Sequence, residues 1–176
     1  MILIQIWTDN DMNTKMSEIS RKRVHSNGVN SIDMITTTLS DGTNLLMVVS
    51  GGDDGAICAS TFEILKDKVR ARDSIVYPCV SACCLTAIRA NDTVVVASGS
   101  EQRLIILSVR DILSDMKSSE NRCGENRCAM RNENRCAMKS MKMHMVDVAD
   151  ISSLDILDGV ITVAGDGMCC FDGLLS

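Results

Sequence analysis

Residues 44–62, NLLMVVSGGDDGAICASTF, contain the pattern that decides the fold. An apolar run ends at Ser50, the turn residues GGDDG follow, and a second apolar run begins at Ala56. Short aliphatic and β-branched runs that are joined by glycine and aspartate are typical of two strands in an antiparallel hairpin. The segment therefore predicts two neighbouring strands of one sheet.

The same layout occurs three times along the chain. In residues 28–62, 82–109 and 149–172, two apolar runs, a tight turn and a third short apolar run follow one another. Strands that follow one another through tight turns form an antiparallel meander, and repetition at this period is typical of repeat architectures. No helical pattern stands between the runs, as a parallel βαβ sheet would need. We therefore expect an all-β fold built from repeated meanders.

Composition sets limits on the class of protein. Of the 176 residues, 45% are hydrophobic but only 2% are aromatic, so we expect a core of aliphatic and methionine side chains. A net charge of −5 argues against a nucleic-acid-binding domain that attracts phosphates through a positive surface potential. No apolar run approaches the roughly 18 residues of a membrane-spanning helix. With an odd count of 9 cysteines, we expect a cytoplasmic protein with reduced thiols and no membrane partner.

Residues 24–62 resemble the WD-repeat family. The stretch HSNGVNSI, which begins at His25, matches the family motif H-x3-V-x2-I, and SGGDDGAI, which begins at Ser50, matches S-G-S-x-D-G-x-I. In that family the histidine, the strand serine or threonine, the turn aspartate and the tryptophan of the closing strand form a buried hydrogen-bonded network. The resemblance implies that His25, Ser50 and Asp54 hold three of these structural positions.

The fourth position of the network departs from the family pattern. Where Trp-Asp is usual, the first unit has the pair ST, the second has LS, and the third has FD, which begins at Phe171. Trp7, near the N-terminus, keeps the tryptophan, and Glu101 keeps an acidic residue at the turn of the second unit. The resemblance therefore implies a WD40-type β-propeller fragment with one truncated blade and about three degenerate blades.

The repeats divide the chain into five parts. Because the run before Trp7 has the form of a closing strand with nothing ahead of it, we expect the chain to begin within a blade of a longer parent. The expected parts are a closing strand of a truncated upstream blade at 1–8, WD-like blades at 24–65, 72–110 and 143–176, and a low-complexity basic insertion at 114–142.

The insertion contains three copies of ENRC, at residues 120–123, 125–128 and 133–136. Six basic residues outnumber three acidic ones between Glu120 and Met143, which suits either a solvated loop or contact with tRNA phosphates. A zinc site is disfavoured because no pair has the C-x2-C spacing that places two thiolates on one metal. The residues weighed for that site are Cys123, Cys128, Cys136 and His144.

Within the family, VDVADISSLD at 146–155 and EQRL at 101–104 are similar to the C-terminal repeats of WD-repeat regulators of a tRNA 2'-O-methyltransferase. The resemblance implies a non-catalytic regulatory subunit for methylation of the anticodon wobble nucleotide. Its protein partner would be that methyltransferase, with tRNA bound indirectly or weakly. The alternative is a generic WD-repeat adaptor for trafficking, ubiquitin ligation or signalling complexes.

An enzyme is the least favoured class. His25, Ser50 and Asp54 can be written as a Ser-His-Asp hydrolase, but the G-x-S-x-G sequence of a nucleophile elbow is missing. The glycine-rich turn before Ala56 is followed by a strand pattern rather than by the helix that would hold a phosphate. We therefore expect no catalytic residue, no cofactor and no metal.

Overall fold

The computed structural model describes residues 2–6, 17–22, 24–39, 41–65, 68–79, 84–99, 103–120, 129–130, 139–142, 151–156, 160–164 and 169–172. Within these ranges, side chains are described for residues 24–39, 41–65, 69–79, 84–99 and 104–118.

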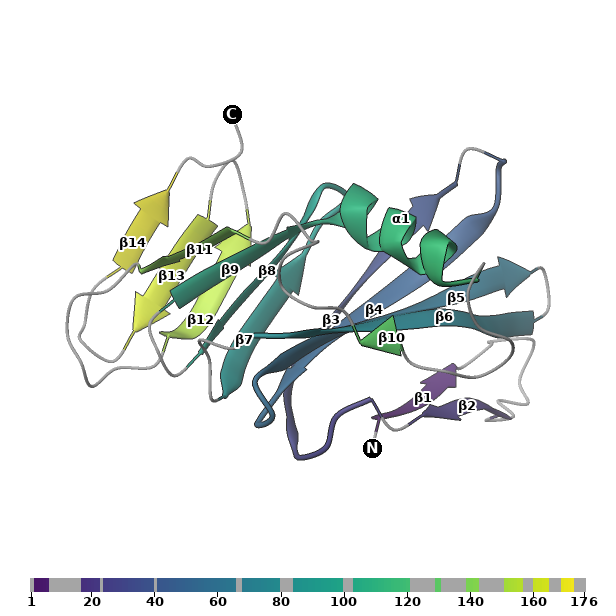
Figure 1. The fold of residues 1–176 in the computed structure, drawn as a ribbon, viewed down its shortest axis with the longest axis horizontal. Helices are drawn as coiled ribbons and strands as arrows, with labels where there is room; N and C mark the ends of the chain where they lie inside the picture. The colour runs from purple at the N-terminus through teal and green to yellow at the C-terminus, as the bar shows by residue number, and fades with distance from the viewer. Residues whose placement is uncertain are drawn as a thin grey trace, which may run out of the picture.

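The first sheet is formed by five strands in the order β10-β6-β5-β4-β3. Strands β3 (Val29–Thr38), β4 (Asn44–Gly52), β5 (Ala56–Leu65) and β6 (Lys68–Pro78) follow one another as an antiparallel meander. The short strand β10 (Ala129–Met130) adds to β6 in parallel. In Figure 1, the blue to teal strands labelled β3 to β6 and the short green strand β10 form this sheet.

The second and third sheets repeat the meander. The second sheet has the order β11-β9-β8-β7, and the third has the order β12-β13-β14, all antiparallel. A separate pair joins β1 to β2, also antiparallel. The bounds are β1 (Ile2–Ile6), β2 (Ser17–Lys22), β7 (Leu85–Ala90), β8 (Val94–Gly99), β9 (Arg103–Ser108), β11 (Lys139–Lys142), β12 (Ile151–Ile156), β13 (Val160–Ala164) and β14 (Cys169–Asp172).

The expected all-β fold is confirmed in the described residues, since the three predicted sets of runs form β3 to β5, β7 to β9 and β12 to β14. The agreement reaches the register. In each sheet the first two strands pair with a bulge after the first residue of the pairing, and the pairing then resumes identically. The equivalent pairs beyond the bulge are Ile32 with Ser50, Ile88 with Ala97, and Leu154 with Thr162.

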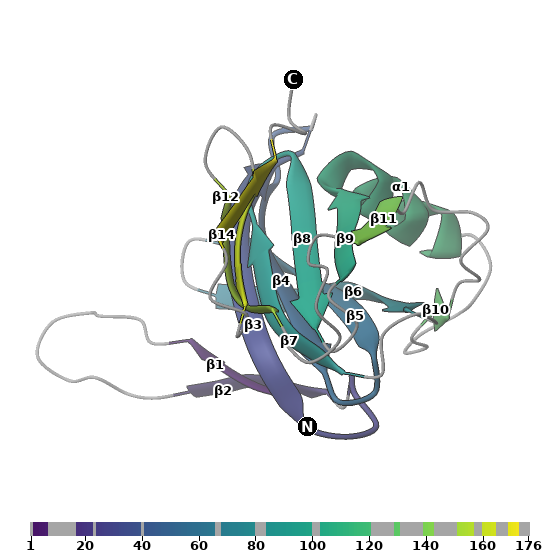
Figure 2. The ribbon, with the colours of Figure 1, turned by 90° about the vertical axis from the view of Figure 1, so that its left-hand side faces the viewer.

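The sheets lie one after another with their first strands side by side. Strand β3 contacts β7, and β7 contacts β12, as both ribbon views show (Figure 1, Figure 2). The main core fills the space between the first and second sheets with aliphatic side chains, in agreement with the low aromatic content. Fully buried members are Met47, Val49, Ile57, Ile88 and Leu107.

Helix α1 overlaps the start of the segment that was expected to be an inserted loop. Helix α1 (Val109–Glu120) covers one margin of the main core, where Ile112 and Met116 are buried. The hydroxyl of Ser108 accepts a hydrogen bond from Asp111 N at 3.4 Å, which is the geometry of an N-cap. The expectation that residues 114–142 form one inserted loop was wrong for the first residues. The apolar spacing that includes Ile112 and Met116, preceded by this cap, was the signal that could have found the helix.

Two strands also depart from the expected division. Residues 72–78, which were assigned to the second unit, lie in β6 and pair with β5 of the first sheet. Residues 139–142, which were assigned to the insertion, form β11 and extend the second sheet. Both are outer strands, whose pairing depends on a neighbouring strand more than on their own apolar pattern. Within 114–142, the described residues are therefore helix at 114–120 and strand at 129–130 and 139–142.

Candidate functional site

The turn between β4 and β5 meets the segment that enters β3. The Nδ1 atom of His25 lies 2.9 Å from Oδ1 of Asp54, and its Nε2 atom lies 2.9 Å from Oγ of Ser50. His25 is 2% exposed and Ser50 is 1% exposed. The structure therefore brings together the three residues that the sequence grouped, in one chain of hydrogen bonds that runs from the turn to Ser50 near the end of β4.

Backbone amides complete the surroundings of Asp54. Ser26 N donates to Oδ2 at 2.8 Å, and Ala56 N donates to Oδ1 at 3.3 Å. Burial by itself raises the pKa of Asp54, but the hydrogen bonds from His25 and Ser26 outweigh it, so the pKa lies below its ordinary value. Asp54 therefore stays a carboxylate that ties the segment before β3 to the β4–β5 turn.

Glycines make this close approach possible. A Cβ atom at Gly52 would collide with the carbonyl oxygen of Gly28 and would lie 3.1 Å from Nδ1 of His25. Gly55, the last residue of the turn, has φ of 64°, in the left-handed region that glycine adopts most easily. The turn sequence GGDDG is thus required by the space beside the imidazole as well as by the hairpin.

The order Asp54, His25, Ser50 has the connectivity of a hydrolase triad, but its burial opposes that chemistry. The hydroxyl of Ser50 lies within the sheet, between the cross-strand neighbours Ile32 and Cys58. A nucleophile has to reach a reacting carbonyl, and a side chain that is 1% exposed offers no approach for one. The geometry suits a structural network in which each buried polar group is paired.

A second cluster joins the first sheet to the second. Asn30 Nδ2 donates to Oδ1 of Asp53 at 2.6 Å and to the carbonyl oxygen of Leu85 at 3.1 Å, and Cys84 Sγ lies 3.3 Å from the same Asp53 oxygen. The hydrogen bond from Asn30, followed by that from Cys84, lowers the pKa of Asp53. These contacts hold the β4–β5 turn against the start of β7.

Side chains of β3 also satisfy the outer edge of β7. Ser31 Oγ accepts from Ile88 N at 3.0 Å, and Asp33 Oδ2 accepts from Ala90 N at 2.9 Å. An edge strand with exposed amides is a liability, and inward-pointing polar side chains are one way to cover it. Sequence reasoning missed Ser31 and Asp33, because their role depends on a strand that lies 57 residues further along the chain.

The pair at the Trp-Asp position of the first unit makes different contacts from those of the family network. Ser60 Oγ donates to Ser74 Oγ at 3.1 Å. Thr61 Oγ1 accepts from Asp73 N at 3.3 Å and lies 3.4 Å from Asp73 O, where the register of β5 and β6 shifts. Both side chains are buried, so the two hydroxyls stabilise the β5–β6 pairing.

Several predicted positions cannot be compared with the geometry. Trp7 and Glu101 lie outside the described residues, as do Cys123, Cys128, Cys136 and His144. Phe171 lies in β14, where it pairs with Ile161. The cysteines whose side chains are described, Cys58, Cys79 and Cys84, are thiols, and Cys84 directly precedes β7.

Within the described ranges, no three metal-ligating side chains gather into a group that could hold an ion. In the same part of the chain, no helix is long and apolar enough to cross a membrane. Comparison with known proteins adds no assignment, since no family model and no curated protein matches the chain.

Proposed function

We propose that the chain is a non-catalytic part of a WD-type β-propeller, and that it serves as a scaffold in the regulatory subunit of a tRNA 2'-O-methyltransferase. The observation that carries the proposal is the buried chain of hydrogen bonds from Asp54 through His25 to Ser50. It occupies the positions that the WD-repeat motif assigns to its histidine, strand serine and turn aspartate.

The arrangement of the sheets supports the propeller. Blades of a propeller are meanders arranged radially, so that the first strands of successive blades are neighbours. Here β3, β7 and β12 are such first strands, and each contacts the next. Their common bulge and register indicate three copies of one structural unit rather than three unrelated hairpins.

A scaffold role follows from where the polar groups lie. The hydrogen bonds of His25 link the β4–β5 turn to the segment before β3. The hydrogen bonds of Asn30 with Asp53 and with Leu85 link the first sheet to the second. Both stabilise the fold and leave the loops at the two ends of the sheets for partner contacts. Propellers present such loops on rigid elements, which suits the docking of a second protein.

The methyltransferase partner rests on the sequence resemblance of residues 101–104 and 146–155. On this proposal the partner supplies the catalytic groups and the S-adenosylmethionine site. The remaining blades of the parent complete the docking face. With a net charge of −5, this chain contributes little to phosphate binding, so tRNA contacts it weakly or indirectly.

The test is genetic and biochemical. Affinity purification of the parent protein is expected to recover a tRNA 2'-O-methyltransferase, and cells without the parent are expected to lose the 2'-O-methyl group of wobble nucleotides. Other tRNA methylations in the same cells serve as the control. Undiminished wobble methylation would rule out the tRNA proposal and leave a generic WD-repeat adaptor.

A further inference from the structure

Asn27 precedes Gly28 in the segment that enters β3, and it is the one asparagine of the sequence that a glycine follows. Both residues are exposed, and both lie between β2 and β3. The side-chain amide of an asparagine can be attacked by the backbone nitrogen of the next residue. Glycine hinders this attack least, because it has no Cβ atom and its backbone moves freely. The pair is therefore the position of the chain at which the attack meets the least resistance.

The described asparagines differ in what holds their side chains. Asn30, Asn44 and Asn91 each form side-chain hydrogen bonds, of which the shortest measure 2.6, 2.9 and 2.9 Å. Within the residues that the structure describes, no such bond holds the carboxamide of Asn27. A bonded carboxamide has to give up its partner before it reacts, which slows the attack. The surroundings thus favour reaction at Asn27, as the sequence does.

The backbone separates the same residues. Asn30 and Asn44 lie in β3 and β4, where pairing with neighbouring strands keeps the chain extended. Asn91 N donates to the carbonyl oxygen of Val94 at 3.0 Å, which fixes the turn before β8. Asn27 lies at a bend outside the strands. The attack forms a ring and needs a bent backbone, so regular pairing opposes it at Asn30 and Asn44.

We propose that Asn27 and Gly28 form a self-modifying site, at which the asparagine converts without an enzyme to aspartate and isoaspartate. The backbone nitrogen of Gly28 gives its proton to water and bonds to Cγ of Asn27. The carboxamide nitrogen takes up a proton and leaves as ammonia. Water then opens the resulting succinimide ring at either carbonyl carbon, which gives aspartate or isoaspartate. The reaction consumes only water, and it does not depend on the tRNA proposal.

The β4–β5 turn holds the chain on both sides of Asn27. Before it, Ser26 N donates to Oδ2 of Asp54 at 2.8 Å. After it, the carbonyl oxygen of Gly28 accepts from Asp53 N at 3.0 Å. The reacting residue therefore spans two fixed contacts with one turn, and a change in its length or charge acts on both of them.

Conversion changes length and charge together. In isoaspartate the main chain runs through the side chain, which inserts one carbon atom between the two contacts. Both products also add a negative charge near a turn that already carries Asp53 and Asp54. We expect isoaspartate to weaken the histidine network, the hydrogen bonds that join Asp54, His25 and Ser50. The site would therefore loosen the first sheet as the protein ages.

The first experiment uses the whole chain of 176 residues, kept folded at neutral pH and body temperature. Mass spectrometry of proteolytic peptides is expected to show conversion at Asn27 about tenfold or more faster than at Asn30, Asn44 or Asn91. Isoaspartate is measured separately with a purified isoaspartyl O-methyltransferase, which transfers a labelled methyl group from S-adenosylmethionine to that residue.

The matched control is Asn27→Gln. It keeps an exposed carboxamide at the same place, but the longer side chain would have to close a larger ring, so methyl incorporation is expected to fall to the background. Gly28→Ala is unsuitable, because a Cβ atom at Gly28 would lie 2.6 Å from Oδ2 of Asp53.

The second experiment measures the effect on the histidine network. The chain has 2 histidines, so NMR can follow the ring signals of His25 once His144→Gln has assigned them. After conversion, these signals are expected to move toward their positions in the urea-unfolded chain. Asn27→Asp adds the charge without the extra carbon atom and is expected to move them less. Asn27→Gln, incubated for the same time, is expected to keep them in place.

Either of two results would overturn the proposed site. One is conversion at Asn27 that is no faster than at the other three asparagines. The other is methyl incorporation that Asn27→Gln leaves unchanged. His25 signals that stay in place when isoaspartate has formed would overturn its effect on the histidine network.

Discussion

In the first sheet, the β4 position opposite Ile32 holds Ser50, whose hydroxyl is bonded to His25. In the second sheet, the equivalent position opposite Ile88 holds Ala97, which is fully buried among aliphatic side chains. The two sheets share bulge and register, so the backbone geometry is the same. The difference teaches that a single meander geometry tolerates either a polar network or apolar packing at this point, provided that every buried group has a partner suited to it.

The residues that pair with Ser50 and Ala97 also differ, in their solvent exposure. Ile32 is mostly exposed and Ile88 is fully buried, although the register makes them equivalent. The first sheet therefore relies on hydrogen bonds near its open face, whereas the second sheet relies on packing on its equivalent face.

The largest expected effect compares these two isoleucines. Ile88→Ala is expected to lower the free energy of unfolding by about 2 to 5 kcal/mol, because it removes buried methyl groups and leaves a cavity. Ile32→Ala is expected to change it by less than about 0.5 kcal/mol, since the side chain is largely in solvent. Urea unfolding curves, recorded at the lowest practicable protein concentration, measure the free energy of unfolding of both variants. Equal losses would show that the two faces are covered alike.

The next effect removes the charge from the histidine network. Asp54→Asn is expected to lower the free energy of unfolding at pH 7 by about 1 to 3 kcal/mol, because a hydrogen-bonded carboxylate is lost from a mostly buried position. The exposed Asp92, in the turn before β8, is a control, and Asp92→Asn is expected to leave the denaturation midpoint unchanged.

The same variant predicts a pH dependence. The pKa of Asp54 lies below its ordinary value of 3.8 in the folded protein, so its carboxylate stabilises the fold above that pH. This contribution is lost as the pH falls through the lowered pKa. The difference in unfolding free energy between the unmodified chain and Asp54→Asn is therefore expected to be full at neutral pH and to shrink below about pH 4. A difference that stays constant to lower pH would contradict the network.

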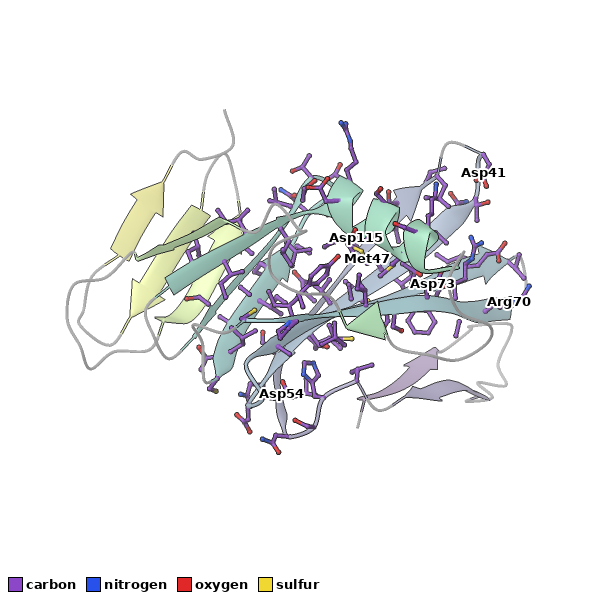
Figure 3. The ribbon with its side chains drawn as sticks, in the orientation of Figure 1. Asp41, Met47, Asp54, Arg70, Asp73 and Asp115 are labelled. Carbon is purple, nitrogen blue, oxygen red and sulfur yellow. The ribbon has the colours of Figure 1, made fainter. Side chains whose placement is uncertain are left out.

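The smallest effect concerns the helix that covers the core between the two sheets. Tyr77 in β6 donates its hydroxyl hydrogen to Oδ2 of Asp115 in α1 at 3.2 Å. Figure 3 shows Asp115 on α1 above Met47, on the far side of the molecule from Asp54 in that view. Tyr77→Phe is expected to lower the free energy of unfolding by about 1 kcal/mol. Backbone amide hydrogen exchange is then expected to become faster in α1 than in β8. An equal increase in both elements would show that the Tyr77–Asp115 hydrogen bond does not specifically hold α1.

Part of this structure was accessible from local patterns. The apolar runs on either side of GGDDG predicted β4 and β5, and the same layout predicted the strands of the other two units. The resemblance of HSNGVNSI and SGGDDGAI to the WD-repeat motif implied a common network of His25, Ser50 and Asp54 before any distance was known. Such predictions succeed because strand alternation and tight turns are set by residues that lie within a few positions of one another.

Other parts depended on residues far apart in the sequence. The pattern KVRARDSIVYP of β6 is interrupted by charges, and it becomes a strand because β5 offers a partner edge. Helix α1 was hidden by the low-complexity residues that follow it, although its cap at Ser108 and its apolar spacing were present. The capping of β7 by Ser31 and Asp33 has no local signature at all.

The sequence by itself determined the all-β class, the repeated meanders and the residues of the histidine network. The class and the meanders follow from short-range rules of alternation and turn formation, whereas the network residues follow from the resemblance to the WD-repeat motif. Tertiary structure decided that Ile88 is buried while Ile32 is open, that α1 covers the core, and that Ser31 and Asp33 face an edge strand. The physical reason is that burial and edge pairing depend on which surfaces meet, and two positions with the same local sequence pattern acquire different solvent exposure when only one of them has a neighbouring sheet.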